Sequence, residues 1–188
     1  MKAIETEISG VWIIEPDVHT DARGYFMESF SEREFRRLTG VERPFVQDNE
    51  SLSTRGVVRG LHFQTGAAAQ AKLVRCVVGT VLDVSVDLRV GSPTFGKHVA
   101  VELSGENKRQ LYLPRGMAHG FSVLTAEALF QYKCDAFYAP EAEGGISLLD
   151  PALGIDWRTA EADMILSPKD RVRPTLAALP LSTLEFDL

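Results

Sequence analysis

The chain has 188 residues, of which 45% are hydrophobic and 24% charged, ordinary values for a soluble globular domain with a sizeable core. The net charge of −6 argues against a general nucleic-acid binder, since such domains are usually basic. No apolar run approaches the ~20 residues of a membrane helix, and the first residues lack a secretory pattern. Cys76 and Cys134 form no CxxC pair and are interpreted as small core residues. We therefore expect a cytoplasmic protein without a membrane segment.

The first regular element predicted along the chain is a short helix beginning after Ser31. Ser31 and Glu34 have the spacing of a capping box. Phe35 and Leu38 give the helix an apolar face, and Gly40 is a typical residue for its end.

Most of the remaining pattern alternates with a period of two, which is typical of β-strands. The clearest predicted strand covers 81–90. One face carries Leu82, Val84, Val86, Leu88 and Val90, and the other carries Asp83, Ser85, Asp87 and Arg89. Shorter strands are expected over 99–103, 111–113 and 130–134, separated by turn signals. Several short strands with one helix indicate an all-β sandwich or barrel.

The chain after Trp157 has the pattern of mixed turns and short helices. Ser167 and Pro168 are typical of an N-cap followed by proline at the first helical position. We expect this C-terminal tail, about 158–188, to pack on the barrel within a single domain spanning 1–188.

A histidine and an arginine stand in the apolar, strand-like segment VVRGLHFQ. His62 alone fits a hydrogen-bonded core residue as well as a catalytic group. In an extended strand, Arg59 and His62 point to opposite faces. Bringing both into one pocket requires a bend or bulge near Gly60.

Two further charged residues have both a structural and a chemical interpretation. Lys72 fits a solvated strand start, or a buried ammonium that stabilises negative charge on an oxygen. Asp170 fits a first-turn helix charge, or a carboxylate that orients His62. Together with Tyr132, these groups are what proton abstraction next to a carbonyl requires.

The segment 114–119, PRGMAH, fits the PxGxxH element of cupin barrels. In metal-binding cupins a histidine at the position of His119 is a ligand, together with an HxH pair and a glutamate. Here His62 is followed by Phe63 and Gln64, and the chain contains no HxH. Three or four protein ligands are normal for a transition-metal site, so no bound metal is expected.

Taken in order, these segments resemble the dTDP-4-dehydrorhamnose 3,5-epimerase family of deoxysugar-nucleotide biosynthesis. The similar segments are DARGYFME, QDNES, VVRGLHFQ, KLVR, DVSVDLRVGSPTFG, LSGENKRQLYLPRGMAHGF, QYKC, YAPEAEGGI, DPALGIDW and LSPKD. They cover nearly the whole chain. The resemblance implies a cupin-type jelly-roll barrel (double-stranded β-helix), no metal or other cofactor, and a homodimer that exchanges N-terminal strands.

The resemblance also implies a role for each matching site residue. It implies His62 as general base, Asp170 as its paired carboxylate, Lys72 as the group that stabilises the enolate, and Tyr132 as the acid on the opposite face. Substrate-binding roles are implied for Arg23, Phe26, Glu28, Gln47, Asn49, Arg59, His119, Tyr138, Glu143 and Lys169. Arg23 and Arg59 match phosphate contacts, Tyr138 matches an aromatic against the base, and Phe26 and Glu28 are assigned to the partner's site.

The implied reaction inverts C3 and C5 of dTDP-4-dehydro-6-deoxy-D-glucose to give dTDP-4-dehydro-L-rhamnose. Departures from the family pattern at His98, at 135–137 and at 148–149 bear on the shape of the pocket. The first alternative is therefore a mono-epimerase that inverts C3 or C5 only. A metal-dependent cupin enzyme and a non-catalytic sugar-nucleotide-binding cupin are further alternatives.

Overall fold

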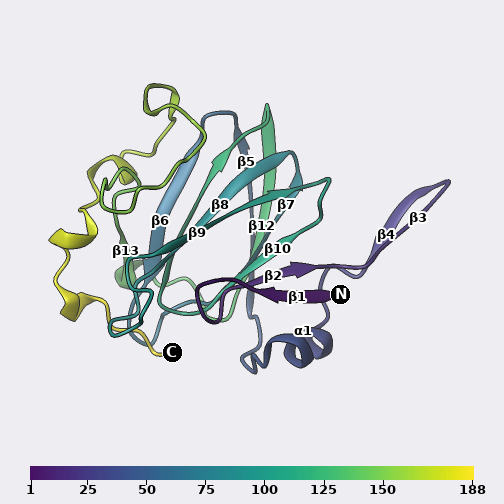
Figure 1. The fold of residues 1–188 in the computed structure, drawn as a ribbon, viewed down its shortest axis with the longest axis horizontal. Coiled ribbons are helices and arrows are strands. Elements are labelled where there is room, and N and C mark those ends of the chain that lie inside the picture. Colours follow the sequence, from purple (N-terminus) through teal and green to yellow (C-terminus); the bar gives the residue numbers. More distant parts are fainter.

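The computed structural model describes residues 1–188 as two facing antiparallel sheets with a projecting hairpin (Figure 1). The six-stranded sheet has the order β1 (Lys2–Glu5), β2 (Trp12–Glu15), β10 (Gln110–Leu113), β7 (Lys72–Val78), β12 (Glu127–Cys134) and β5 (Gln47–Thr54). The five-stranded sheet has the order β13 (Glu143–Gly145), β6 (Val58–Gln64), β11 (Met117–Val123), β8 (Thr80–Asp87) and β9 (His98–Ser104). The prediction of an all-β sandwich or barrel is confirmed.

The interior of the barrel is an apolar cluster supplied by both sheets. Val74 on β7 and Phe130 on β12 come from one sheet, and Val81 on β8 and Phe121 on β11 come from the other. The rings of Phe121 and Phe130 stack with centroids 4.2 Å apart. Each fully buried side chain of this size contributes about 1.5–3 kcal/mol, so this cluster holds the two sheets together. Cys76 and Cys134 are both buried and unpaired, as expected of core cysteines.

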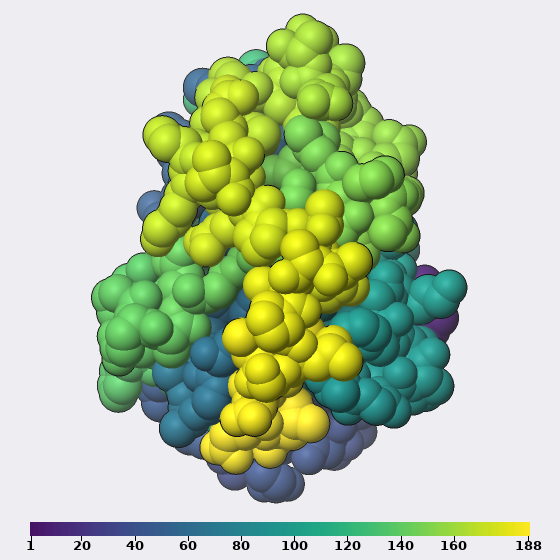
Figure 2. All heavy atoms as spheres, turned by 90° about the vertical axis from the view of Figure 1, so that its left-hand side faces the viewer, coloured from purple at the N-terminus to yellow at the C-terminus, as the bar shows by residue number.

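The outer face of the five-stranded sheet is covered by the C-terminal tail. Leu82, Val84 and Val86 on β8 are buried in a cluster with Trp157 and Leu184 of the tail. Figure 2 shows the C-terminal residues, in yellow, running across this side of the molecule. Because side chains alternate along a strand, the polar face of β8 points into the barrel.

The predicted strand end at Val90 is wrong. The strand β8 ends at Asp87, and Val90 is 54% exposed. The Asp87 carboxylate accepts hydrogen bonds from Arg89, Ser92 and Thr94. These contacts turn the chain away from the sheet immediately after Asp87, because they satisfy a buried charge that would otherwise be costly.

The predicted helix is confirmed as α1 (Glu32–Thr39). The Ser31 side chain accepts a hydrogen bond from the Glu34 backbone N–H at 3.5 Å. Gly40 ends the helix in the left-handed conformation with φ of 72°. Phe35 is the buried residue of α1, and its ring packs against Tyr112 of β10 with centroids 5.2 Å apart.

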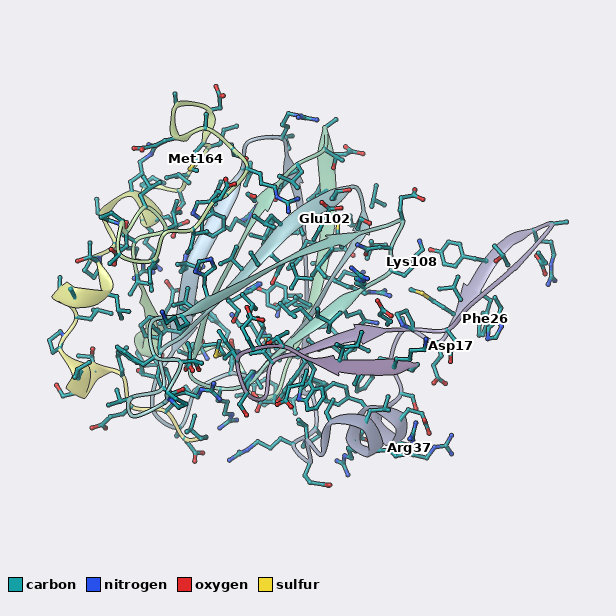
Figure 3. The ribbon with its side chains drawn as sticks, in the orientation of Figure 1. Asp17, Phe26, Arg37, Glu102, Lys108 and Met164 are labelled. Atoms are coloured by element: carbon teal, nitrogen blue, oxygen red, sulfur yellow. The ribbon has the colours of Figure 1, made fainter.

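The hairpin formed by β3 (Val18–Asp21) and β4 (Gly24–Met27) projects away from the barrel (Figure 1). Phe26 on this hairpin is 71% exposed, and Figure 3 places it outside the body of the barrel. The hairpin therefore buries little of its own surface within one chain.

The tail contains short 3-10 helices, in agreement with the predicted turns and short helices. The tail helices are η2 (Glu161–Asp163), η3 (Asp170–Val172), η4 (Leu176–Ala178) and η5 (Leu181–Thr183), and one further 3-10 helix, η1 (Pro140–Ala142), precedes the tail. The helix η3 begins at Asp170, two residues later than the predicted start at Pro168. Ser167 still accepts a hydrogen bond from the Asp170 N–H at 3.1 Å. None of the helices has the length and apolar character that a membrane span requires.

Candidate active site

A cavity of about 630 Å³ opens between the two sheets. Its walls come from β5, β6, β7, β11 and β12 and from the tail around η3. The sequence-predicted site residues in its lining are Asn49, Arg59, His62, Lys72, His119, Tyr132 and Asp170. The structure therefore brings all four predicted catalytic residues into one cavity.

Strand β6 is irregular at Gly60, as the sequence required for Arg59 and His62 to share a pocket. The pairing of β6 with β11 shifts register between His119 and Phe121. Gly60 has φ of 131°, and a Cβ there would lie 2.6 Å from the Cα of Gly120. A side chain at position 60 would collide with backbone, so the irregularity depends on glycine.

His62 on β6 contacts Asp170, which η3 supplies from the far end of the chain. His62 Nε2 lies 2.5 Å from Asp170 Oδ1, and the two side chains are 35% and 4% exposed. Burial raises the pKa of Asp170, but hydrogen bonds with His62 and Ser167 outweigh burial and lower it below its ordinary value. Asp170 is thus an acceptor for an Nε2–H donor, which leaves His62 Nδ1 available to take a proton.

Lys72 on β7 and Tyr132 on β12 lie on neighbouring strands of the opposite sheet. The Lys72 ammonium is 5.8 Å from the centroid of the Tyr132 ring and has no carboxylate within ion-pair distance. Burial lowers the pKa of Lys72 against the opposing charges of Cys134 and Asp83. Burial also raises the pKa of Tyr132. The phenol therefore keeps its proton at neutral pH and can donate it.

A second histidine–carboxylate pair lies beside the first. His119 Nε2 is 2.8 Å from Asp83 Oδ2, and His119 is directly opposite His62 in the β6–β11 ladder. Burial raises the pKa of Asp83, opposed by His119 and Lys72. Asp83 Oδ1 is buried without a hydrogen-bond partner in the chain. Asp83 was not a predicted site residue, although its place on the polar face of a buried strand was a usable signal.

Several predicted substrate-binding residues surround the opening of the cavity. Gln47 and Tyr138 line an adjoining pocket of about 260 Å³ with Asn49. The Glu143 carboxylate accepts hydrogen bonds from Tyr138 and Lys169, each at 2.7 Å. Burial raises the pKa of Glu143, but these bonds and a third from an arginine lower it to about 2.

The third donor to Glu143 is Arg173, which the sequence did not single out. Its Nη2 lies 2.6 Å from Glu143 Oε1. Its sequence context, DRVRPT, offers no pattern that separates it from the neighbouring Arg171. Only the folded chain shows that one of these two arginines is paired.

The structure does not bring Arg23, Phe26 or Glu28 to the cavity of their own chain. Arg23 and Phe26 lie on the projecting hairpin, and Glu28 follows it directly. Arg23 forms a local ion pair with Asp21 at 2.5 Å. None of these three residues lines the cavity of its own chain.

The protein residues do not form a metal-binding cluster. No group of three or more His, Cys, Asp or Glu side chains converges in a way that could hold a metal ion. His62 and His119 are instead each engaged by one carboxylate. A metal-free reaction remains a prediction, which metal analysis of the purified protein tests.

Two facing sheets enclose two histidines, each paired with a carboxylate, together with a lysine and a tyrosine, which defines a cupin-type barrel with groups suited to acid–base chemistry. A sequence model described as dTDP-4-dehydrorhamnose 3,5-epimerase matches residues 5–178. The chain belongs to this family of epimerases. The predicted family and the cupin-type jelly-roll fold are thereby confirmed.

Individual relatives agree with this assignment. The chain is 54% identical over 170 residues to the dTDP-4-dehydrorhamnose 3,5-epimerase of Shigella flexneri, covering 90% of this chain and 93% of that protein. A crystal structure of the dTDP-6-deoxy-D-glucose-3,5-epimerase of Legionella pneumophila in complex with dTDP-4-keto-L-rhamnose has a TM-score of 0.95 at 49% identity, covering 100% of this chain and 98% of that one. A 3'-monoepimerase of Streptomyces bikiniensis in complex with dTDP-quinovose has a TM-score of 0.86 at 40% identity, covering 94% and 88%.

Proposed function

We propose that the protein inverts C3 and C5 of dTDP-4-dehydro-6-deoxy-D-glucose to give dTDP-4-dehydro-L-rhamnose. One observation carries the proposal: in a member of this family, the His62–Asp170 pair, Lys72 and Tyr132 line a single cavity. A base, an electrophile and an acid within one cavity are the groups that proton transfer next to a ketone needs.

His62 starts the reaction by removing the proton from the carbon next to the C4 ketone. The Asp170 carboxylate holds the imidazole in one orientation and stabilises the positive charge that forms on it. Because Asp170 is nearly fully buried, its negative charge is little screened by water. The pair therefore holds His62 in the orientation that the base requires.

Lys72 stabilises the negative charge that develops on the C4 oxygen. Its ammonium has no carboxylate partner in the chain, so it is free to contact the enolate. The pair of His119 and Asp83 adds a second polar group on the facing wall, which the five-stranded sheet forms. C3 and C5 both adjoin C4, so one enolate-stabilising group serves both inversions.

Tyr132 returns a proton to the face opposite His62, which inverts the carbon. It lies on the six-stranded sheet, whereas His62 lies on the five-stranded sheet. Two groups on opposite walls are required because a single group would restore the original configuration.

The nucleotide part of the substrate is assigned to the opening of the cavity. Arg59 supplies a cation for the phosphates, and Tyr138, 52% exposed, presents an aromatic face for the base. The other substrate-binding residues at the opening are Gln47, Asn49, Glu143 and Lys169. The dTDP-sugar substrate therefore binds with its sugar inside the cavity and its nucleotide at the opening.

The active enzyme is a homodimer in which the hairpin of one protomer completes the cavity of its partner. The exposure of Phe26 and the absence of Arg23 from the lining of its own cavity support this arrangement. Mixing inactive Arg23→Ala and His62→Ala proteins tests it. Random C2 dimers would regain about a quarter of wild-type sites, and a mixture that stays inactive would contradict the exchange.

The two unpaired cysteines support a reducing compartment, the cytoplasm.

Product analysis by NMR tests the proposed reaction. The purified protein is incubated with dTDP-4-dehydro-6-deoxy-D-glucose, and the ring couplings of the product report each centre. A product with both centres inverted supports the proposal. Inversion at one carbon would instead place the protein with the mono-epimerases. Full activity after chelation and without bound metal is expected, and activity that requires iron or zinc would contradict the mechanism.

A further inference from the structure

Arg173 lies directly after η3, the 3-10 helix that carries Asp170, and it is seated against strand β13. Its Nη2 donates to Glu143 Oε1 at 2.6 Å, and both side chains are 16% exposed. A Cβ at Gly145 would lie 2.7 Å from Arg173 Nε. The guanidinium thus occupies the space that a side chain at position 145 would take, which makes the contact part of the packing and not a surface ion pair.

This contact joins the segment that holds Asp170 to the strand beside His62. Strand β13 pairs with β6, with Gly145 opposite His62 and Glu143 opposite Gln64. The next residue after Arg173 makes a second attachment, because the Pro174 carbonyl accepts a hydrogen bond from the Ser147 N–H at 2.7 Å. Two consecutive residues therefore fasten the end of η3 to the wall that carries His62.

The Arg173 charge also acts on the histidine–carboxylate pair. Burial raises the pKa of Asp170, and hydrogen bonds with His62 and Ser167 lower it. The positive charge of Arg173 lowers this pKa further. A nearby cation opposes the formation of a positive imidazolium. The other charged or titratable groups around the pair are Glu50 on β5, Arg59 on β6, Lys72 on β7, Asp83 on β8, His119 on β11, Tyr132 on β12, Glu143 on β13 and Lys169 in the tail.

We infer that Arg173 is a positioning residue that holds Asp170 against His62 through its ion pair with Glu143. The inference rests on the proposed function of His62 as the base. Arg173 does not line the cavity and acts through other residues. Its removal loosens the Asp170 segment and takes one positive charge away from the pair.

The test compares Arg173→Gln, Arg173→Lys and the matched control Arg171→Gln. Arg171 is an exposed arginine in η3 without an ion pair in the structure. We expect Arg173→Gln to lower kcat/KM by about 10- to 100-fold, the range for a displaced catalytic geometry. In an Asp170→Asn background the same substitution should have little further effect, because Arg173 acts through Asp170. Arg173→Lys keeps the charge and should recover part of the lost rate, and Arg171→Gln behaves as wild type.

A second measurement separates this inference from the proposed function. NMR observation of the hydrogen-bonded His62 Nε2–H proton needs no substrate, and its signal is expected to broaden or move upfield in Arg173→Gln but not in Arg171→Gln. An unchanged signal would overturn the inference, as would a full additional rate loss from Arg173→Gln in the Asp170→Asn background. A wild-type protein that does not turn over the sugar nucleotide would contradict the proposed function, while the His62 signal would still decide the role of Arg173.

Discussion

Replacing Asp170 by asparagine tests the histidine–carboxylate pair with little change in shape. The carboxylate is 4% exposed and lies 2.5 Å from His62 Nε2. Hydrogen bonds to charged groups contribute about 1.5–3 kcal/mol. Since about 1.4 kcal/mol is a factor of ten in rate, Asp170→Asn should lower kcat by about 10- to 150-fold.

The pH profile distinguishes loss of charge from loss of folding. Without the negative charge, a protonated His62 is less favourable, so the acid limb of kcat/KM should move to lower pH. The control is Asp163→Asn, an exposed tail residue without a side-chain hydrogen bond in the structure. An Asp170→Asn protein with near wild-type kcat and an unmoved acid limb would refute the role of the pair.

Three further substitutions separate the remaining roles. Lys72→Met should lower kcat by about 10²–10³-fold with little effect on KM, as for the loss of an oxyanion donor; a change in KM alone would contradict this. Tyr132→Phe should still exchange substrate hydrogen with solvent through His62 but return the original configuration, and normal inversion would exclude Tyr132 as the acid. Glu143 has a pKa lowered from 4.5 to about 2, so it stabilises the fold above pH 4.5 and this contribution is lost as the pH falls toward 2. Acid unfolding of Glu143→Gln should therefore depend less on pH in this window than that of wild type, and identical curves would contradict the buried ion-pair cluster.

The local elements of the fold could be predicted because their signals lie in neighbouring residues. Ser31, Glu34 and Gly40 define both ends of α1 within ten residues. The end of β8 could not be predicted, because it depends on side chains that fold back from 89–94 onto Asp87. The alternation of apolar and polar residues continues to Val90, but hydrogen bonds to the buried Asp87 carboxylate end the strand at Asp87.

The candidate site was predictable as a set of residue types and in one pair, His62 with Asp170, but its other pairs were not predictable. His62, Lys72 and Tyr132 stood out because polar groups are unusual in apolar strands. The pairing of Asp83 with His119 depends on the register of β8 and β11, which are 36 residues apart at this contact. Arg173 required the path of the tail across β13, a contact between distant parts of the chain that leaves no local pattern.

The hairpin residues illustrate a different limit. Arg23 and Phe26 were predicted from a family resemblance to contact substrate, yet neither lines the cavity of its own chain. Assigning these residues to the partner's site requires that two chains assemble into a dimer. A sequence pattern in one chain does not encode where an exposed hairpin docks, so the subunit-mixing experiment carries this part of the proposal.

The most direct test of the central claim is the number of deuterium atoms that the product takes from solvent. The protein is incubated with dTDP-4-dehydro-6-deoxy-D-glucose in deuterated water, and the product is examined by mass spectrometry and NMR. Proton abstraction at both C3 and C5 predicts two deuterium atoms at those carbons in an L-configured product. One deuterium would contradict double epimerisation, and none would contradict the proposed proton-transfer chemistry altogether.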